Sequence, residues 1–135
     1  MPHFHIDCSP NLVPRLEVHG LDLQGLCRVV AEAAAKTGLF PLAGIRVRVA
    51  VADAYYIADG NPGHAYLDLS VRLRAGREVL AKQAATAAIF AALETYCAPI
   101  MATSSFMLSM EMRDIDAALS PKASSIRSYL PKEML

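Results

Sequence analysis

The run AYLDLSVRLR, residues 65–74, alternates apolar and polar side chains along its whole length. A period of two residues is typical of a β-strand with one buried face and one polar face. The run DGNPG, residues 59–63, is dense in turn residues and marks the point where this strand begins. Residues 2–8, 45–52 and 106–113 show the same alternation. The sequence therefore predicts four strands, and we interpret 45–52 and 65–74 as an antiparallel pair.

Two runs between the strands have apolar side chains at helical spacing. Residues 22–37 predict a first helix, which ends at Gly38, a residue suited to a C-terminal cap. Residues 77–97 predict a second helix, with a middle so apolar and rich in alanine that we expect it to be buried against a neighbour. Pro99 is expected to end it, because proline cannot continue a helix. Residues 11–20 lack a clear period and are expected to form a connector.

The predicted elements follow the order strand, helix, strand, strand, helix, strand, which resembles a duplicated β-α-β unit. Parallel strands joined through a helix take a right-handed crossover, so both helices should lie on one face of a four-stranded mixed sheet. The opposite face would be bare unless another surface covers it. We therefore expect a two-layer α+β fold and a single domain over residues 1–135, with a core over about 2–115. The tail, residues 116–135, lacks periodicity and is expected to contact another subunit.

The composition argues against several classes of protein. Lys and Arg (13) balance Asp and Glu (13), so the chain lacks the basic field that drives nucleic-acid binding. Charges interrupt the apolar runs before the roughly 18 residues of a membrane span, and the N-terminal residues do not resemble a signal peptide, so we expect a cytoplasmic protein. Hydrophobic residues make up 54% of the chain, which predicts apolar contacts between subunits. The three cysteines and four histidines lack the spacing of a disulfide framework or a metal site, so no metal ligand is assigned.

Pro2 is a candidate catalytic residue. Removal of Met1 would leave a secondary amine at the start of the first predicted strand. An ordinary terminal amine titrates at about 7.7–8.0, and burial or neighbouring cations lower its pKa toward neutrality, where it becomes a usable general base. Met-Pro is also simply a common way to begin a chain, and these two residues alone do not separate the two interpretations.

Five short strings point to a known family. They are PHF (2–4), TG (37–38), FPLAGIR (40–46), ADG (58–60) and AGR (75–77). The strings and their order are similar to those of the 5-carboxymethyl-2-hydroxymuconate isomerases, which the chain resembles from its second residue to about residue 115. FPLAGIR is by far more specific than the N-terminal proline alone.

The resemblance implies membership of the tautomerase superfamily and a homotrimer of β-α-β-β-α-β subunits. It implies an amino-terminal proline that acts as acid and base without a metal or an organic cofactor. The implied reaction belongs to the bacterial degradation of homoprotocatechuate (4-hydroxyphenylacetate) and converts the dienol 5-carboxymethyl-2-hydroxymuconate to its oxo isomer. The implied partners are this small polycarboxylate substrate and further copies of the chain.

Arg46 and Arg77 are the candidate substrate-binding arginines. Each lies in a string that matches the family, and an arginine fork holds a carboxylate through two hydrogen bonds. Their charges would also lower the pKa of Pro2. Which arginine binds which carboxylate is left open, as is a contribution from a neighbouring subunit. Phe40 is expected to give the pocket an apolar wall. Arg48 shares a strand face with Arg46, and a salt bridge at an interface is the competing interpretation.

Four further residues have structural interpretations beside functional ones. His3 should point to the sheet face opposite to Pro2, which favours a structural role. Tyr55 and Tyr56 suit either the pocket wall or a core or interface position. His5 stands where an aliphatic residue would suit a buried strand, and is one of two departures that bear on substrate preference. The other departure is the long connector before the first helix.

Two other functions fit the same residues. One is a promiscuous keto-enol tautomerase of the phenylpyruvate type, which uses the same proline on a smaller acid. The other is a non-enzymatic trimeric binding module, which a superfamily resemblance to macrophage migration inhibitory factor permits. Retention of Met1 would favour the binding module, because an amide nitrogen is not a base.

Overall fold

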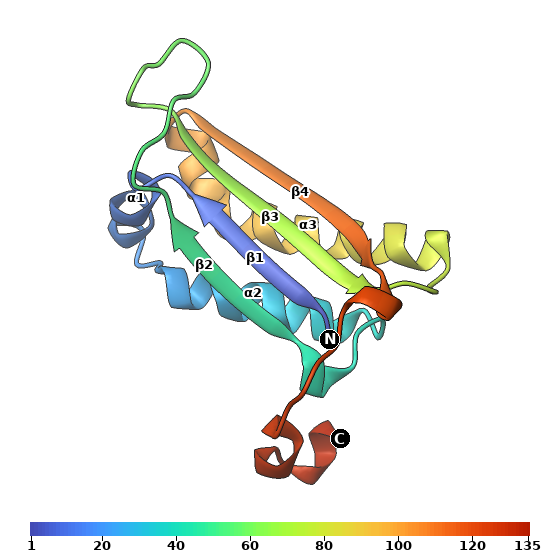
Figure 1. The fold of residues 1–135 in the computed structure, drawn as a ribbon. Coiled ribbons are helices and arrows are strands. Elements are labelled where there is room, and N and C mark those ends of the chain that lie inside the picture. Colours follow the sequence, from blue (N-terminus) through green and yellow to red (C-terminus); the bar gives the residue numbers. More distant parts are fainter.

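The structure, a computed structural model, describes all residues from 1 to 135. Its sheet has four strands in the spatial order β2-β1-β3-β4 (Figure 1). The strands are β1 (His3–Cys8), β2 (Arg46–Val51), β3 (Ala65–Arg74) and β4 (Phe106–Ile115). β1 is parallel to β2 and antiparallel to β3, and β3 is parallel to β4. The four predicted strands and the mixed sheet are therefore confirmed.

The predicted pairing of β2 with β3 is wrong, because β1 lies between them. Each β-α-β half places its two strands side by side, as the parallel pairs β1–β2 and β3–β4 show. The halves then join through their first strands, β1 and β3, which run antiparallel. The turn-rich segment before β3 therefore reverses the chain across β1 rather than closing a hairpin.

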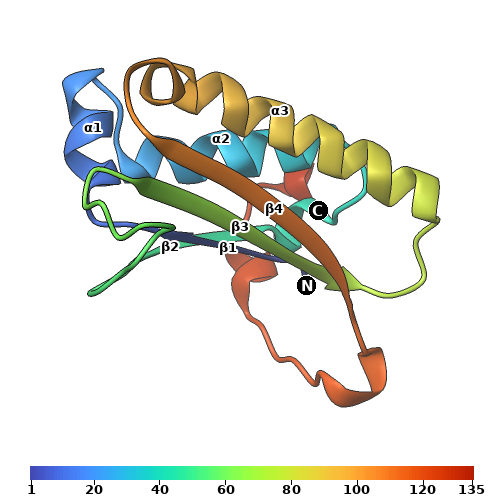
Figure 2. The same ribbon diagram turned by 90° about the horizontal axis from the view of Figure 1, so that it is seen from above.

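Helix α2 (Leu23–Lys36) confirms the first predicted helix. Asp22 caps its first turn, since the carboxylate accepts a hydrogen bond from the Gly25 amide at 2.7 Å. The helix ends at Lys36, and its C-cap residue, Thr37, is followed by Gly38 with φ of 70°. Helices α2 and α3 cover the same face of the sheet (Figure 2), as the crossover rule requires.

Helix α3 (Val79–Thr103) begins two residues later and ends six residues later than predicted. Pro99 lies inside it, so the prediction that proline ends the helix is wrong. Pro99 loses one helical hydrogen bond, but Ile100 beyond it is buried, and the Ser104 amide bonds to the Ile100 carbonyl at 3.0 Å. Burial of Ile100 thus outweighs the missing bond.

One face of helix α3 packs against α2 and the sheet. The buried residues of this face are Ala85, Ile89, Leu93, Cys97 and Ile100. The alanines on its other side, including Ala84, Ala87 and Ala91, are exposed, so the predicted burial of the whole middle holds for one side only. By length and composition alone α3 could cross a membrane, a test that core helices of globular domains also pass. The face that packs against the sheet and α2 gives it such a core role.

Residues 11–20 do not form the predicted connector but contain a short helix, α1 (Leu12–Val18). Leu12 and Leu16, one turn apart, are fully buried. Pro14 fits because it lies in the first turn, where amides have no partner within the helix. With only two buried side chains, the segment has too short an apolar pattern to reveal its period.

The core lies between the sheet and the helices. Phe4 and Ile6 of β1 are fully buried there, and the Phe4 ring meets Phe40 edge to face with 5.0 Å between centroids. The alternate residues of β1 lie on the opposite, open face, so His5 does not occupy a buried position. The open face is polar: the Tyr66 hydroxyl donates to Asp7 Oδ1 at 2.8 Å.

Candidate active site

The beginning of β1 borders a cavity of about 410 Å³. Its lining residues come from the N-terminus, the segment 40–44, the end of β3 with the following turn, and the tail: Met1, Pro2, Phe40, Pro41, Ala43, Gly44, Leu73, Arg74, Arg77, Lys122, Ser124 and Arg127. The structure thus brings together three residues that the sequence singles out, Pro2, Phe40 and Arg77. No Asp or Glu side chain lines the cavity.

Arg46, the fourth of these residues, lines an adjoining cavity of about 200 Å³. The alternation of β1 explains this separation. Pro2 is buried on the helix side, whereas His3 faces the open side, where Arg46 is its register partner. The Arg46 guanidinium donates to His3 Nε2 at 2.7 Å. The two cavities share Met1, Arg74 and Lys122, so the N-terminus lies where they meet.

Gly44 lets Pro2 sit deep in the cavity. It ends a 3-10 turn (Leu42–Gly44), and its amide bonds to the Pro41 carbonyl at 2.9 Å. A Cβ at Gly44 would lie 3.0 Å from Pro2 Cδ, which is closer than ordinary van der Waals contact. Absence of a side chain at Gly44 therefore fixes how closely the proline ring approaches the cavity wall.

The charges around the N-terminus lower the pKa of its amine below the ordinary value of 8.0. Burial is the largest cause, followed by a hydrogen bond and a charge from Lys122 and by the charges of Arg46 and Arg74. This amine belongs to Met1 while Met1 is present. Removal of Met1 would transfer it to Pro2, which is the more buried of the two residues and lines the same cavity.

His3 is held as a neutral imidazole. Burial, and then the charges of Arg46, Arg72 and Arg48, lower its pKa from 6.5 to about 4. A neutral ring leaves Nε2 free to accept the Arg46 hydrogen bond. The predicted orientation of His3, away from the face of Pro2, is confirmed. Through this hydrogen bond, His3 positions the Arg46 side chain.

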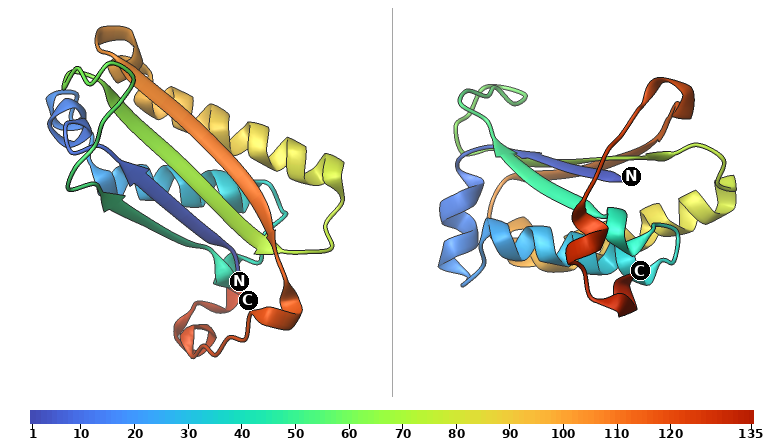
Figure 3. Two further views of the ribbon diagram at one scale, coloured as in Figure 1. Left: turned by 45° about the horizontal axis from the view of Figure 1, so that its top comes forward. Right: turned by 60° about the horizontal axis from the view of Figure 1, so that its bottom comes forward.

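The sequence did not identify four polar residues of the cavity: Arg74, Lys122, Ser124 and Arg127. Arg74 is the last residue of β3, and its carbonyl accepts a hydrogen bond from Arg77 Nη1 at 2.9 Å. The sequence signal that could have identified Arg74 was its position only three residues before Arg77. The other three belong to the tail, which Figure 3 shows returning to the end of the sheet where β1 begins. The tail has no period that could have revealed this path.

Tyr55 and Tyr56 do not line this cavity in the chain that carries them. They belong to the segment between β2 and β3, at the opposite end of the sheet (Figure 1). The Tyr55 hydroxyl donates to the Pro62 carbonyl at 3.0 Å, and Tyr56 is 78% exposed. Within one chain, the interpretation of these tyrosines as pocket wall is therefore wrong.

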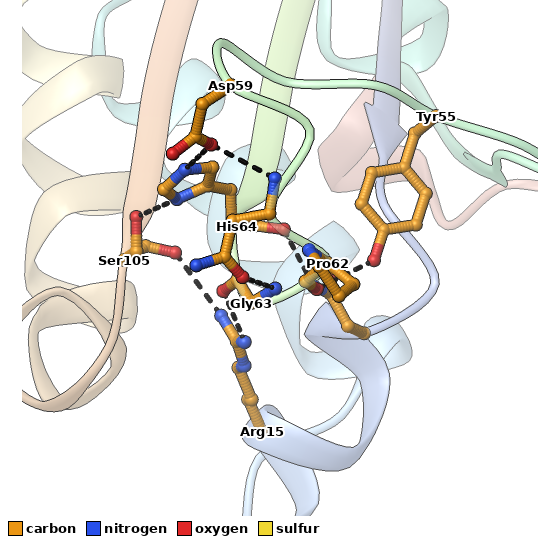
Figure 4. A network of polar contacts seen from close by, with 9 residues as sticks. Arg15, Tyr55, Asp59, Pro62, Gly63, His64 and Ser105 are labelled. Atoms are coloured by element: carbon orange, nitrogen blue, oxygen red, sulfur yellow. Dashed lines mark hydrogen bonds and ion pairs between the residues drawn. The ribbon is translucent and has the colours of Figure 1, made fainter.

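A separate polar cluster, formed by Asp59, His64, Ser105 and Arg15, secures that distant segment (Figure 4). His64 contacts Ser105 Oγ through Nδ1 at 2.6 Å and Asp59 Oδ1 through Nε2 at 2.8 Å. Hydrogen bonds from the Asn61 amide and from His64 lower the pKa of the Asp59 carboxyl. We refer to this group as the loop clamp.

Asp59 and its neighbours also explain the string ADG. Gly60 has a φ of 82°, which favours glycine, and Ala58 has a φ of 53°, which is uncommon for a residue with a Cβ atom. Asp59 between them contacts His64 within the loop clamp. The string therefore records the shape of a loop, and none of its residues lines either cavity at the N-terminus.

The sequence model of the family described as 5-carboxymethyl-2-hydroxymuconate isomerase matches residues 2–130. A curated relative, 5-carboxymethyl-2-hydroxymuconate Delta-isomerase from Escherichia coli, is 35% identical over 128 residues, which are 95% of this chain and 98% of the relative.

Solved structures agree. The crystal structure of a 5-carboxymethyl-2-hydroxymuconate isomerase from Deinococcus radiodurans R1 is 31% identical, with a TM-score of 0.79 over 97% of this chain and 95% of the other. A fused 4-OT wild-type symmetric trimer, 22% identical, shares the fold with a TM-score of 0.61 over 84% of this chain and 85% of the other. The chain therefore has the fold of the tautomerase superfamily and belongs to the 5-carboxymethyl-2-hydroxymuconate isomerase family.

Proposed function

We propose that this protein is a cofactor-independent isomerase that converts 5-carboxymethyl-2-hydroxymuconate to its oxo isomer, in the cytoplasm, during the degradation of homoprotocatechuate. One observation above all supports this: Pro2 borders a cavity that has four cationic side chains and no acidic one. The cations are Arg74, Arg77, Lys122 and Arg127. Such a cavity favours a substrate with several carboxylates near a proline base.

Arg77 is the first residue proposed to bind a substrate carboxylate. Its planar fork suits bidentate contact with a carboxylate, and its bond to the Arg74 carbonyl restricts its position. Phe40, Leu73 and Ala43 give the same cavity an apolar part that suits the carbon skeleton of the substrate. Arg46 then acts from the adjoining cavity, where its positive charge lowers the pKa of the terminal amine.

Pro2 is the proposed base and acid. After Met1 is removed, its neutral nitrogen takes the proton of the substrate 2-hydroxyl. The oxygen electrons form the carbonyl, the double bonds shift along the conjugated system, and the far-end carbon accepts the proton that Pro2 returns. Arg74 and Arg77 stabilise the negative charge of the dienolate between the two transfers. A positioned acid or base contributes about 10² to 10⁴-fold to the rate.

The functional unit is proposed to be a homotrimer in which each chain forms one domain. The open face of the sheet carries no helix (Figure 2), and another copy would cover it. The likeness to a fused 4-OT symmetric trimer supports the same assembly.

Two alternative functions differ from this isomerase in how they would use the cavity. A phenylpyruvate-type tautomerase would use the same apolar wall and proline for a smaller acid. A binding module without catalysis would follow if Met1 stays in place, since Met1 itself lines the cavity and keeps the Pro2 nitrogen in an amide.

The experiment is ultraviolet kinetics on the dienol substrate with protein whose processed N-terminus has been verified by mass spectrometry. We expect rapid turnover, and a loss of about 10²-fold or more in kcat for Pro2→Ala. Undiminished turnover in Pro2→Ala would refute the mechanism. Faster turnover of phenylpyruvate enol than of the tricarboxylate would favour the first alternative.

A further inference from the structure

We propose that the tail segment 120–130 supplies a second carboxylate subsite, in which Lys122 and Arg127 make the enzyme selective for polycarboxylates over monocarboxylates. This inference rests on the proposed function of the Pro2 cavity. It assigns to the tail a role in substrate specificity, in addition to the effect of Lys122 on the pKa of the terminal amine.

The cavity has two sources of positive charge. The folded core supplies Arg74 and Arg77, which lie at the end of β3 and in the turn that follows it. The tail supplies Lys122 and Arg127, together with the Ser124 hydroxyl. The two groups reach one cavity from segments that are about 45 or more residues apart in the sequence.

The tail cations have no carboxylate partner within the chain. The ion pairs of the structure join His64 to Asp59, Lys82 to Asp114 and Arg113 to Glu111, and none involves a cavity residue. Lys122 also lines the adjoining cavity, so its charge faces both sides of the N-terminus. Unpaired cations of this density, in a chain of zero formal net charge, attract an anionic ligand.

The number of unpaired cations predicts the class of ligand. A monocarboxylate can pair with the core arginines and leave the tail cations without a carboxylate partner. A ligand with two or three carboxylates can pair with both groups, and about 410 Å³ falls in the range of small-ligand pockets. The tail should therefore contribute to binding of the tricarboxylate and add little for phenylpyruvate.

The first test compares Arg127→Gln with wild type on both substrates, because Lys122, unlike Arg127, also acts on the terminal amine. Lys132→Gln is the matched control, since it removes a tail lysine that lines neither cavity. Loss of this charge-assisted contact should raise KM for 5-carboxymethyl-2-hydroxymuconate about 10-fold, with kcat within about threefold. For phenylpyruvate enol, kcat/KM should change by less than about threefold. Equal losses on both substrates, or no loss on the tricarboxylate, would overturn the subsite.

The second test separates this inference from the proposed reaction. Tricarballylate has three carboxylates and no enol, so its binding, measured by calorimetry, does not depend on turnover. We expect the double variant Lys122→Gln/Arg127→Gln to bind it about 10-fold or more weakly than wild type and Lys132→Gln to bind it equally well. Tail-dependent binding without isomerase activity would support the subsite and refute the reaction. Isomerase activity with binding unaffected by the double substitution would support the reaction and refute the subsite.

Discussion

At the scale of single residues, the site depends on the alternation of β1. Pro2 lies on the buried side and His3 on the open side, so their neighbours differ although they are adjacent in the chain. The period of two was visible in the sequence and correctly gave both orientations. It could not show that the wall beside Pro2 is Gly44, because that contact joins residues 42 positions apart and depends on the turn of segment 40–44.

The charges around the N-terminus predict the pH dependence of the enzyme. The proposed mechanism needs the neutral amine of Pro2. In the intact chain, burial together with Lys122, Arg46 and Arg74 lowers the pKa of the Met1 amine below 8.0, and we expect the same surroundings to lower the pKa of the Pro2 amine once Met1 is removed. Therefore kcat/KM should rise with pH and level off above that lowered pKa. Arg74→Gln removes one cation, so the pKa should rise and the rising limb should move up by roughly half a pH unit.

The measurement is a pH profile of kcat/KM between about pH 5 and 9 for wild type and Arg74→Gln. The pH at which kcat/KM rises, rather than the height of the plateau, reports the pKa of the amine. Arg113→Gln is the control, because Arg113 pairs with Glu111 and contributes no charge that affects the terminal amine. A limb that moves to lower pH in Arg74→Gln would contradict this account.

At the scale of elements, long periodic segments were predictable and short or interrupted ones were not. β3 was predicted to the residue, since each of its ten positions keeps the alternation. α1 was missed because its burial rests on two leucines. The end of α3 was misplaced because a local rule for proline was applied where burial of Ile100 decides the outcome. Prediction from local propensity therefore fails where the burial of one side chain in the fold contributes more to stability than the local preference does.

The loop clamp is an element-scale device with its own prediction. Ser105→Ala removes the hydroxyl that contacts His64 Nδ1, so the segment 52–64 should open more often. We expect amide hydrogen exchange near Asn61 to become several-fold faster, since one hydrogen bond contributes about 0.5–1.5 kcal/mol. Isomerase activity should stay unchanged, because the loop clamp lies outside both N-terminal cavities.

Hydrogen exchange followed by mass spectrometry checks this, with Ser128→Ala as the control for an exposed serine in the tail. Unchanged exchange in Ser105→Ala would show that the segment is held by other contacts, such as those of Arg15 with Gly63 and Ser105 carbonyls.

At the scale of the whole molecule, the open face of the sheet is the largest feature that one chain leaves without a covering layer. Its arginines, including Arg46, Arg48 and Arg72, crowd the beginning of β1. The sequence predicted this bare face from the crossover rule alone. It could not place the tail, whose turns, such as Ile126–Tyr129, follow no pattern but bring two cations to the cavity.

A trimer predicts a particle with about three times the 14.5 kDa mass of one chain. Arg48→Glu reverses a charge on the open face and should shift the protein toward smaller species, with loss of activity if a neighbouring copy completes the site. Lys36→Glu, at the end of α2 on the other face, should leave the trimer intact. Analytical ultracentrifugation distinguishes the outcomes, and a monomeric wild type would contradict the proposed assembly.

The N-terminus and the tail lie at the same end of the sheet, as Figure 3 shows, and residues of both line the Pro2 cavity. An affinity tag fused to the amino end would block the cavity and prevent formation of the free proline. A tag fused to the carboxyl end would follow directly on the tail, whose side chains line the same cavity. The surface segment between β2 and β3, at the far end, is the better place for a label or an immobilising anchor.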